Sequence, residues 1–216
     1  MTEVIRIHNV SVCFANIPVF ESVHLSVANK EKTTIAGPSG SGKSTLVRCI
    51  MGFVPIATGS VFINNVELTP RSVWRLRAQM AFVAQEPELG DGTVREALTR
   101  PFSYHANRHI QYSETEALRL FEHILLPCDL MDKETSALSG GEKQRVALVG
   151  ALLLQRPILL LDEAASALDE TSKTAVRDFL TDRTDLTILS VSHDTRGFAF
   201  SGPVTDITRM TRKAAS

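Results

Sequence analysis

The stretch Gly37-Pro38-Ser39-Gly40-Ser41-Gly42-Lys43-Ser44-Thr45 decides the fold that this sequence predicts. It fits the pattern GxxxxGK[ST], in which glycines let consecutive backbone N–H groups turn inward around phosphates. Residues 33–36 before it predict a strand, and apolar residues at helical spacing over 44–51 predict a helix after it. We therefore expect a nucleotide site in which Lys43 lies on the β- and γ-phosphates and Ser44 ligates Mg²⁺. A chance glycine-rich turn explains neither the strand nor the helix.

A second stretch places two carboxylates at the end of a strand. Asp162 and Glu163 follow the wholly apolar residues 158–161, and ligands of a doubly wound sheet lie at the carboxyl ends of its strands. We expect Asp162 to hold Mg²⁺, directly or through water, and Glu163 to orient and activate the attacking water as general base. The alternative is a pair of solvated acids at a strand end.

The third stretch, Leu138-Ser139-Gly140-Gly141-Glu142-Lys143-Gln144-Arg145, lies between the other two. Ser139 with Glu142 three residues later predicts a capping box at the start of a helix. A well-capped helix is therefore the simplest interpretation. It does not explain Gly140 and Gly141, because glycines weaken a helix start unless the backbone must approach something closely.

The three stretches, in this order, resemble the ATPases of the ABC transporter family, and the likeness extends over about residues 5–207. It implies a dimer, because Ser139, Gly141 and the helix dipole of one copy would hold the γ-phosphate of ATP bound to the other. One polypeptide then carries two half-sites. The chain departs from the family pattern at Ala164-Ala165, where proline often follows the glutamate, and at Val149-Gly150-Ala151, which replaces Ala-Arg-Ala.

The resemblance gives roles to four further positions, each with a simpler alternative. Gln85 matches a glutamine that contacts Mg²⁺ and the water, but could be an ordinary loop residue. His193 matches a histidine that touches the γ-phosphate, and a lone histidine is more often structural. Asp169 matches a loop that crosses the dimer interface, or caps a helix. Phe14 matches an aromatic that stacks on adenine, or belongs to the core.

The resemblance thus implies ATP and Mg²⁺ as ligands of a catalytic set that comprises Glu163, His193, Gln85 and Lys43. The implied metal ligands are Ser44, Gln85 and Asp162. The implied ATP-binding residues are Phe14, Gly37, Ser39, Gly40, Ser41, Gly42, Lys43, Ser44, Thr45, Ser139, Gly140, Gly141 and Asp169.

The predicted fold class is α/β: a P-loop NTPase core of ABC type, with an N-terminal antiparallel β-subdomain and an inserted α-helical subdomain. We expect one domain over 1–216, with the core at about 1–85 and 139–216 and the helical subdomain at about 86–138. Further strands are expected at 5–8, 23–27, 59–63, 80–84 and 186–191. Further helices are expected at 93–98, 113–126, 141–155 and 170–180; Ser113 and Glu116 predict a capping box.

Composition excludes several classes of protein. The 216 residues include 23 Lys and Arg against 24 Asp and Glu, so no overall positive field favours nucleic acid as a partner. The three cysteines are far apart, which fits neither a disulfide framework nor a zinc site and predicts mostly buried, reduced thiols. No apolar run approaches the roughly 20 residues of a membrane span, and the start lacks a signal-peptide layout. We therefore expect a cytoplasmic protein, peripheral on the membrane through a separate permease.

The leading hypothesis is the ATP-hydrolysing subunit of an ABC transporter, which dimerises head to tail around two Mg·ATP and drives a permease that docks near residues 85–104. Residues 85–94 and 162–173 resemble small stand-alone ATPases linked to metal or iron export. A soluble ABC-type ATPase of an assembly complex, such as iron–sulfur cluster building, is the alternative. A nucleotide-binding module that signals without turnover is a third. The cargo and its direction stay open at this point.

Overall fold

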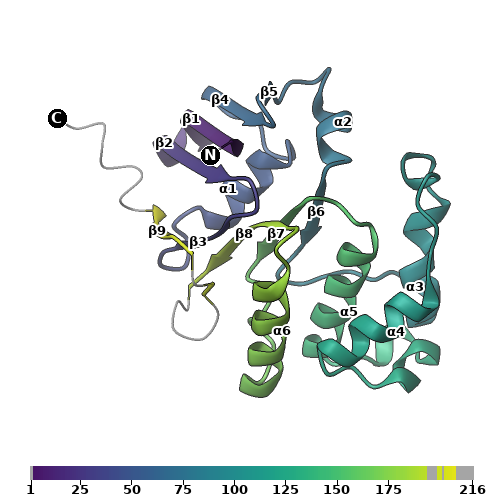
Figure 1. Ribbon diagram of the computed structural model, residues 1–216. Coiled ribbons are helices and arrows are strands. Elements are labelled where there is room, and N and C mark those ends of the chain that lie inside the picture. The colour runs from purple at the N-terminus through teal and green to yellow at the C-terminus, as the bar shows by residue number, and fades with distance from the viewer. Residues whose placement is uncertain (1, 194–198, 201, 208–216) are drawn as a thin grey trace.

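The computed structural model describes residues 2–193, 199–200 and 202–207. Two sheets organise it (Figure 1). The parallel sheet has the strand order β6 (Met80–Val83), β7 (Ile158–Asp162), β8 (Thr187–Ser192), β3 (Lys32–Ala36), β9 (Val204–Asp206). The antiparallel sheet has the order β2 (Ile17–Ala28), β1 (Glu3–Phe14), β4 (Thr58–Ile63), β5 (Val66–Glu67). The expected α/β class with an N-terminal antiparallel sheet is confirmed.

The central strand β7 is apolar throughout because both faces of the parallel sheet are covered. Its residues alternate between two cores: Ile158 and Leu160 pack with α1 (Lys43–Ile50) and the antiparallel sheet, whereas Leu159 and Leu161 face the other side. That second side is covered by α5 (Gly140–Leu153) and α6 (Glu170–Asp182) (Figure 1). Helix α1 thus lies between the two sheets, directly after β3.

The antiparallel sheet is built from a long hairpin and a crossing. Ala15 and Asn16 both have positive φ, 49° and 65°, and link Phe14 to Ile17 in the two-residue turn that suits a hairpin's twist. Gly59 of β4 passes so close to β1 that a Cβ there would lie 2.2 Å from the Asn9 carbonyl oxygen. Only glycine fits at that crossing.

The helical part lies between β6 and α5 in the chain. It contains α3 (Val94–Thr99) and α4 (Glu114–His123), with the short 3₁₀ helices η1 (Arg100–Ser103), η2 (His105–Asn107), η3 (Cys128–Asp132) and η4 (Thr135–Ala137). Helix α2 (Val73–Arg77) precedes β6. The elements from α3 to η4 lie within residues 86–138, where the helical subdomain is predicted, and the exact limits of that subdomain stay a prediction. Residues 208–216 of the expected core lie outside the described part.

Several local predictions were wrong. The helix expected to reach residue 126 ends at His123, because Leu125 has a φ of 57°. The capping box at Ser113 is half made: Glu116 N–H donates to Ser113 Oγ, and the structure shows no return bond. Two of the three cysteines, Cys13 and Cys128, are exposed. The sequence did not predict α2, β5 or β9.

Candidate functional site

Four strands bring the predicted residues to one edge of the parallel sheet. The glycine loop follows β3, Gln85 follows β6, Asp162 ends β7 and His193 follows β8. These strands are neighbours and all parallel. Their carboxyl ends therefore meet at the edge where open α/β sheets bind ligands.

The glycine loop leads into α1 through left-handed backbone. Gly40 and Gly42 have φ of 77° and 89°, and Gly42 is the N-cap of α1. Lys43 is only 4% exposed and folds back, so that its Nζ donates to the carbonyl oxygens of Gly37 and Pro38, each at 2.9 Å. Ser39 is exposed in the loop. The Lys43 ammonium thus lies inside the loop, where phosphate oxygens would replace the two carbonyl oxygens as its hydrogen-bond acceptors.

The two proposed metal ligands from the loop and from β7 touch each other. Ser44 Oγ donates to Asp162 Oδ1 at 2.7 Å. Asp162 is 1% exposed, and this burial raises the pKa of its carboxyl above the ordinary value, against the lowering effect of the Ser44 hydrogen bond. A hydroxyl and a carboxylate oxygen side by side fit the oxygen ligands that Mg²⁺ prefers. A buried carboxylate also gains from a cation beside it.

Glu163 is the centre of the arrangement. Gln85 Nε2 donates to its Oε2 at 3.0 Å, His193 Nδ1 lies 3.2 Å from the same oxygen, and Lys43 Nζ lies 3.7 Å from Oε1. Its backbone has a φ of 48°, a left-handed conformation that is strained for a side chain of this size. The structure thus brings Gln85, Lys43, Glu163 and His193 together.

The segment 139–141 does not join this group. Ser139 is the N-cap of α5 and forms the full capping box with Glu142, whose pKa is lowered by the backbone hydrogen bond from Ser139. Within the described ranges, no hydrogen bond or ion pair connects 139–141 with residues 37–45. Gly141 also has a reason within its own chain, because a Cβ there would lie 2.8 Å from the Ala167 carbonyl oxygen. Gly140 has more space: its Cβ would meet the Ala167 Cβ at 3.5 Å.

Two further predicted residues have clear local roles. Asp169 is the N-cap of α6: Ser172 N–H donates to Oδ1 and the Ser172 hydroxyl to Oδ2, and these bonds lower the pKa of Asp169. Asp169 therefore caps a helix, and its role at a dimer interface stays a prediction. Phe14 ends β1 and is 50% exposed, so its interpretation as a core residue was wrong. Its ring remains open to a ligand.

Gln144 belongs to the site, although no sequence motif predicted it. It lies in α5, is 2% exposed, and its side-chain amide contacts three residues of two other segments through both its nitrogen and its oxygen. The available signal was a polar residue at helical spacing with Leu148 and Ala151, on an apolar face of the helix.

Comparison with known proteins decides the family. The model of the ABC transporter family matches residues 20–166. The chain belongs to the ABC transporter family. It is 34% identical over 194 residues to the energy-coupling factor transporter ATP-binding protein EcfA1 of Oenococcus oeni, covering 86% of this chain and 68% of that one. It is 30% identical over 193 residues to the probable iron export ATP-binding protein FetA of Escherichia coli, covering 88% and 84%.

Solved ABC cassettes share the fold. A dimeric bacterial ABC transporter cassette superposes with a TM-score of 0.79 at 26% identity, over 94% of both chains. The same cassette in a post-hydrolysis state, bound to ADP and phosphate, gives 0.75 at 27% over 88% of both. Some relatives are longer, and the chain spans 64%, 32% and 15% of three of them. The predicted P-loop core of ABC type and the ATPase class are thereby confirmed.

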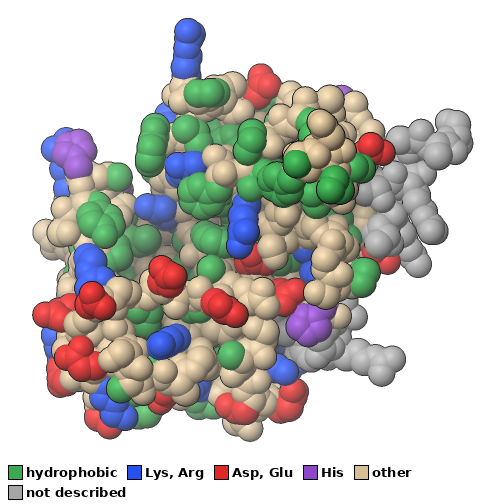
Figure 2. All heavy atoms as spheres, turned by 180° about the vertical axis from the view of Figure 1, so that it is seen from behind, with side chains coloured by type: hydrophobic (Ala, Val, Ile, Leu, Met, Phe, Trp, Pro, Cys, Tyr) green, Lys and Arg blue, Asp and Glu red, His purple; other side chains and the backbone are tan. Residues whose placement is uncertain are grey.

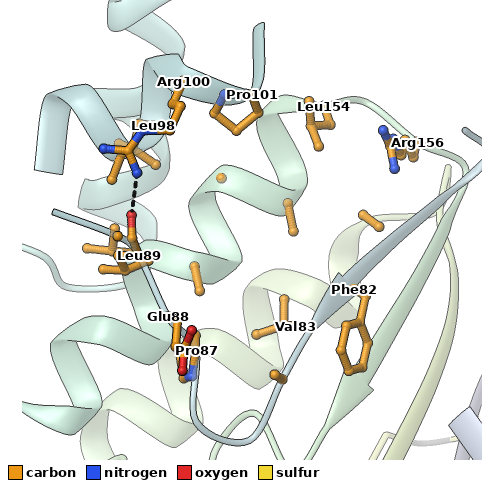
Figure 3. Close-up of a pocket in the computed structure, with 18 of the residues that line it drawn as sticks. Phe82, Val83, Pro87, Glu88, Leu89, Leu98, Arg100, Pro101, Leu154 and Arg156 are labelled. Carbon is orange, nitrogen blue, oxygen red and sulfur yellow. Dashed lines mark hydrogen bonds between the residues drawn. The ribbon is translucent and has the colours of Figure 1, made fainter. Parts of the chain in front are cut away.

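This ABC ATPase has a groove of about 610 Å³ beside the candidate site. Figure 3 shows β6 along one side, with Phe82 and Val83, and the segment from α3 into η1 across from it. Small residues of α5 form its floor, Ala147, Gly150 and Ala151 among them. Figure 2 shows this face hollowed between the helical part and the body, with hydrophobic side chains in and around the hollow. Phe53 and Tyr104, 54% and 55% exposed, border it.

No helix in the described ranges combines the length and the apolar character that a membrane span requires.

Proposed function

We propose that this ABC ATPase hydrolyses ATP as a head-to-tail homodimer around two Mg·ATP, and drives substrate movement through a separate membrane permease. The observation that carries the proposal is Glu163, a carboxylate held by Gln85, His193 and Lys43 beside the Ser44–Asp162 pair. A base, an amide, a cation and a metal-ligand pair at one sheet edge are the parts that phosphoryl transfer to water needs.

Each group has a role that its present contacts support. Lys43 would exchange the carbonyls of Gly37 and Pro38 for the β- and γ-phosphates. Ser44, Asp162 and Gln85 would hold Mg²⁺, which when bound supplies charge that neutralises the phosphate oxygens. Glu163 would take a proton from the water whose oxygen bonds to the γ-phosphorus while the bond to the β–γ bridging oxygen breaks. His193, 3.2 Å from Glu163, would contact the γ-phosphate.

The loop has further groups for the phosphates. Gly37, Gly40 and Gly42 would present their backbone N–H groups to them. The Ser41 hydroxyl is buried and, among the described residues, has no hydrogen-bond partner. A buried polar atom without a partner is costly, and a phosphate oxygen would satisfy it. Thr45 would complete this cradle.

The second copy would supply what one chain lacks. Ser139 and Gly140 are exposed at the N-terminal end of α5, where the helix dipole favours an anion. Ser139 and Gly141, with Gly140 between them, would bind the γ-phosphate of the ATP held by the partner. Asp169 would lie near the interface, and Phe14 would stack on adenine. The dimeric cassette supports this arrangement. ATP would hold the dimer closed because it contacts both subunits only in that state.

The groove is the proposed docking surface for the permease. It is mostly apolar with exposed aromatic residues at its border, a composition typical of partner sites. Ala84 and Pro87, on either side of Gln85, line it, so a partner seated there lies beside the residue that holds Glu163. On this proposal the chain acts at the cytoplasmic face of the membrane. Similarity to FetA supports metal or iron export as the transport function. Similarity to the EcfA1 proteins supports a role in an energy-coupling factor transporter instead.

The test is capture of membrane proteins with tagged Glu163→Gln in Mg·ATP from detergent-solubilised cells. We expect one multi-span protein to co-purify. The residues that line its substrate cavity then distinguish metal or iron export from energy-coupling transport. Gly150→Leu, which places a side chain over the groove floor, should lose that protein. Arg119→Leu adds the same side chain on the exposed part of α4 and should retain it. Soluble factors alone would support an assembly ATPase instead.

A further inference from the structure

Gln144 connects the segments that carry the catalytic groups. Its Nε2 donates to the Gln85 carbonyl oxygen at 2.8 Å and to Ser166 Oγ at 3.1 Å, and its Oε1 accepts from Ala167 N–H at 3.1 Å. The Glu163 carbonyl oxygen lies 3.5 Å from the same nitrogen. The orientation of the amide is fixed, because only an oxygen can face the Ala167 N–H.

These contacts form a continuous path from α5 to the proposed base. Gln144 lies five residues after Ser139, the N-cap of α5. It holds the Gln85 backbone, while the Gln85 side chain donates to Glu163 Oε2 at 3.0 Å. It also holds residues 166–167 of the loop that follows Glu163. One buried amide therefore fixes Gln85 and the loop relative to the start of α5.

We propose that Gln144 is the positioning residue that couples the start of α5 to Gln85 and Glu163. Hydrolysis then requires α5 to lie where Gln144 can bond both Gln85 and the loop at 166–167. The inference rests on the proposed role of Glu163. The reason for the coupling is geometric. Loss of the amide frees the Gln85 backbone and the loop independently, and a displacement near 1 Å of a catalytic group lowers turnover by about 10²-fold.

Two substitutions separate positioning from packing. Gln144→Met keeps the approximate size but removes every hydrogen bond. Gln144→Glu keeps the shape, and its protonated carboxyl can donate to the Gln85 carbonyl oxygen while it accepts from Ala167 N–H. The charged form can accept but not donate. Burial and facing carbonyl oxygens favour the protonated form, as do Glu86, Glu88 and Glu163 nearby, whereas Lys143 opposes it; Glu86, Glu88 and Lys143 line the same hollow of about 460 Å³.

The experiment measures steady-state ATP hydrolysis by the full chain from about pH 5.5 to 8.5. We expect Gln144→Met to lower kcat by about 10- to 100-fold, with the KM for ATP changed by less than about threefold and the deficit constant with pH. Gln144→Glu should retain more activity than Gln144→Met wherever its carboxyl is protonated, because that form still donates to the Gln85 carbonyl oxygen. Gln155→Glu, the same change at an exposed position just after α5, is the control for added charge.

Wild-type kcat in Gln144→Met would overturn the inference. So would wild-type kcat in Gln144→Leu, which also removes every hydrogen bond and keeps the test decisive even where Gln144→Met fails to fold. Glu163→Gln in the same assay tells the two levels apart. If it hydrolyses ATP at the wild-type rate, the proposed function is wrong and this inference falls with it. If it is inactive while Gln144→Met and Gln144→Leu are active, only the role of Gln144 is wrong.

Discussion

Gly141→Ala provides a quantitative test of the close packing between α5 and the loop at Ala167. The new Cβ would lie 2.8 Å from the Ala167 carbonyl oxygen and 3.5 Å from Leu168 Cδ2. The first contact is with backbone, so the helix or the loop must shift, and overpacking of this kind costs about 1–3 kcal/mol. Alanine recovers about 0.5–1 kcal/mol over glycine within a helix. The net expected loss is therefore up to about 2.5 kcal/mol.

Gly150→Ala is the matched control on the same helix. Its Cβ would meet Leu98 Cδ2 at 3.5 Å, an ordinary contact, so only the helix gain of about 0.5–1 kcal/mol remains. Thermal and urea unfolding of both variants without nucleotide gives the comparison. Gly150→Ala should melt above wild type and Gly141→Ala below it, with about 2–4 °C for each 1 kcal/mol. Equal melting temperatures for the two variants would refute the account of Gly141.

Burial and exposure of Asp162, Cys49 and Phe14 have consequences that can be measured. Burial holds the pKa of Asp162 above its unfolded value. The stability that Asp162 contributes is therefore complete below the unfolded pKa and is lost as the pH rises through the folded pKa. Asp162→Asn should melt higher than wild type at pH 7, with the difference in melting temperature closing in acid, and it should lose Mg²⁺-dependent hydrolysis. Burial raises the pKa of Cys49 to about 12, so iodoacetamide at pH 8 should label Cys13 and Cys128, and all three cysteines only in urea, as mass spectrometry will show. Phe14→Ala should weaken ATP binding measured by calorimetry and leave triphosphate binding unchanged.

The sequence predicted the parts of the site that arise from local patterns. The glycine loop is read from nine consecutive residues, and the place of Asp162 and Glu163 follows from one apolar strand. Because all the strands concerned are parallel neighbours, placing each residue after a strand also placed Gln85 and His193 at the same edge. The resemblance to the ABC family selected Gln85 and His193, and the parallel topology explains why they lie at the same edge.

Contacts between distant segments could not be predicted in this way. Gln144 is bonded to residues 22, 23 and 59 positions away in the chain, and nothing local to α5 reveals those partners. The same holds for Gly141 of α5, whose neighbour Ala167 belongs to the loop that follows Glu163. The predicted helix end at residue 126 failed for a local reason, because apolar spacing continues past the left-handed Leu125.

The most direct test of the account is single-turnover phosphate release by Glu163→Gln, with the molar mass measured by light scattering in Mg·ATP. We expect phosphate release to be slowed by about 10²- to 10⁴-fold, with ATP still bound and the mass doubled to that of a stable dimer. Release at the wild-type rate would contradict the role of Glu163, and a mass that stays monomeric with ATP bound would contradict the shared site.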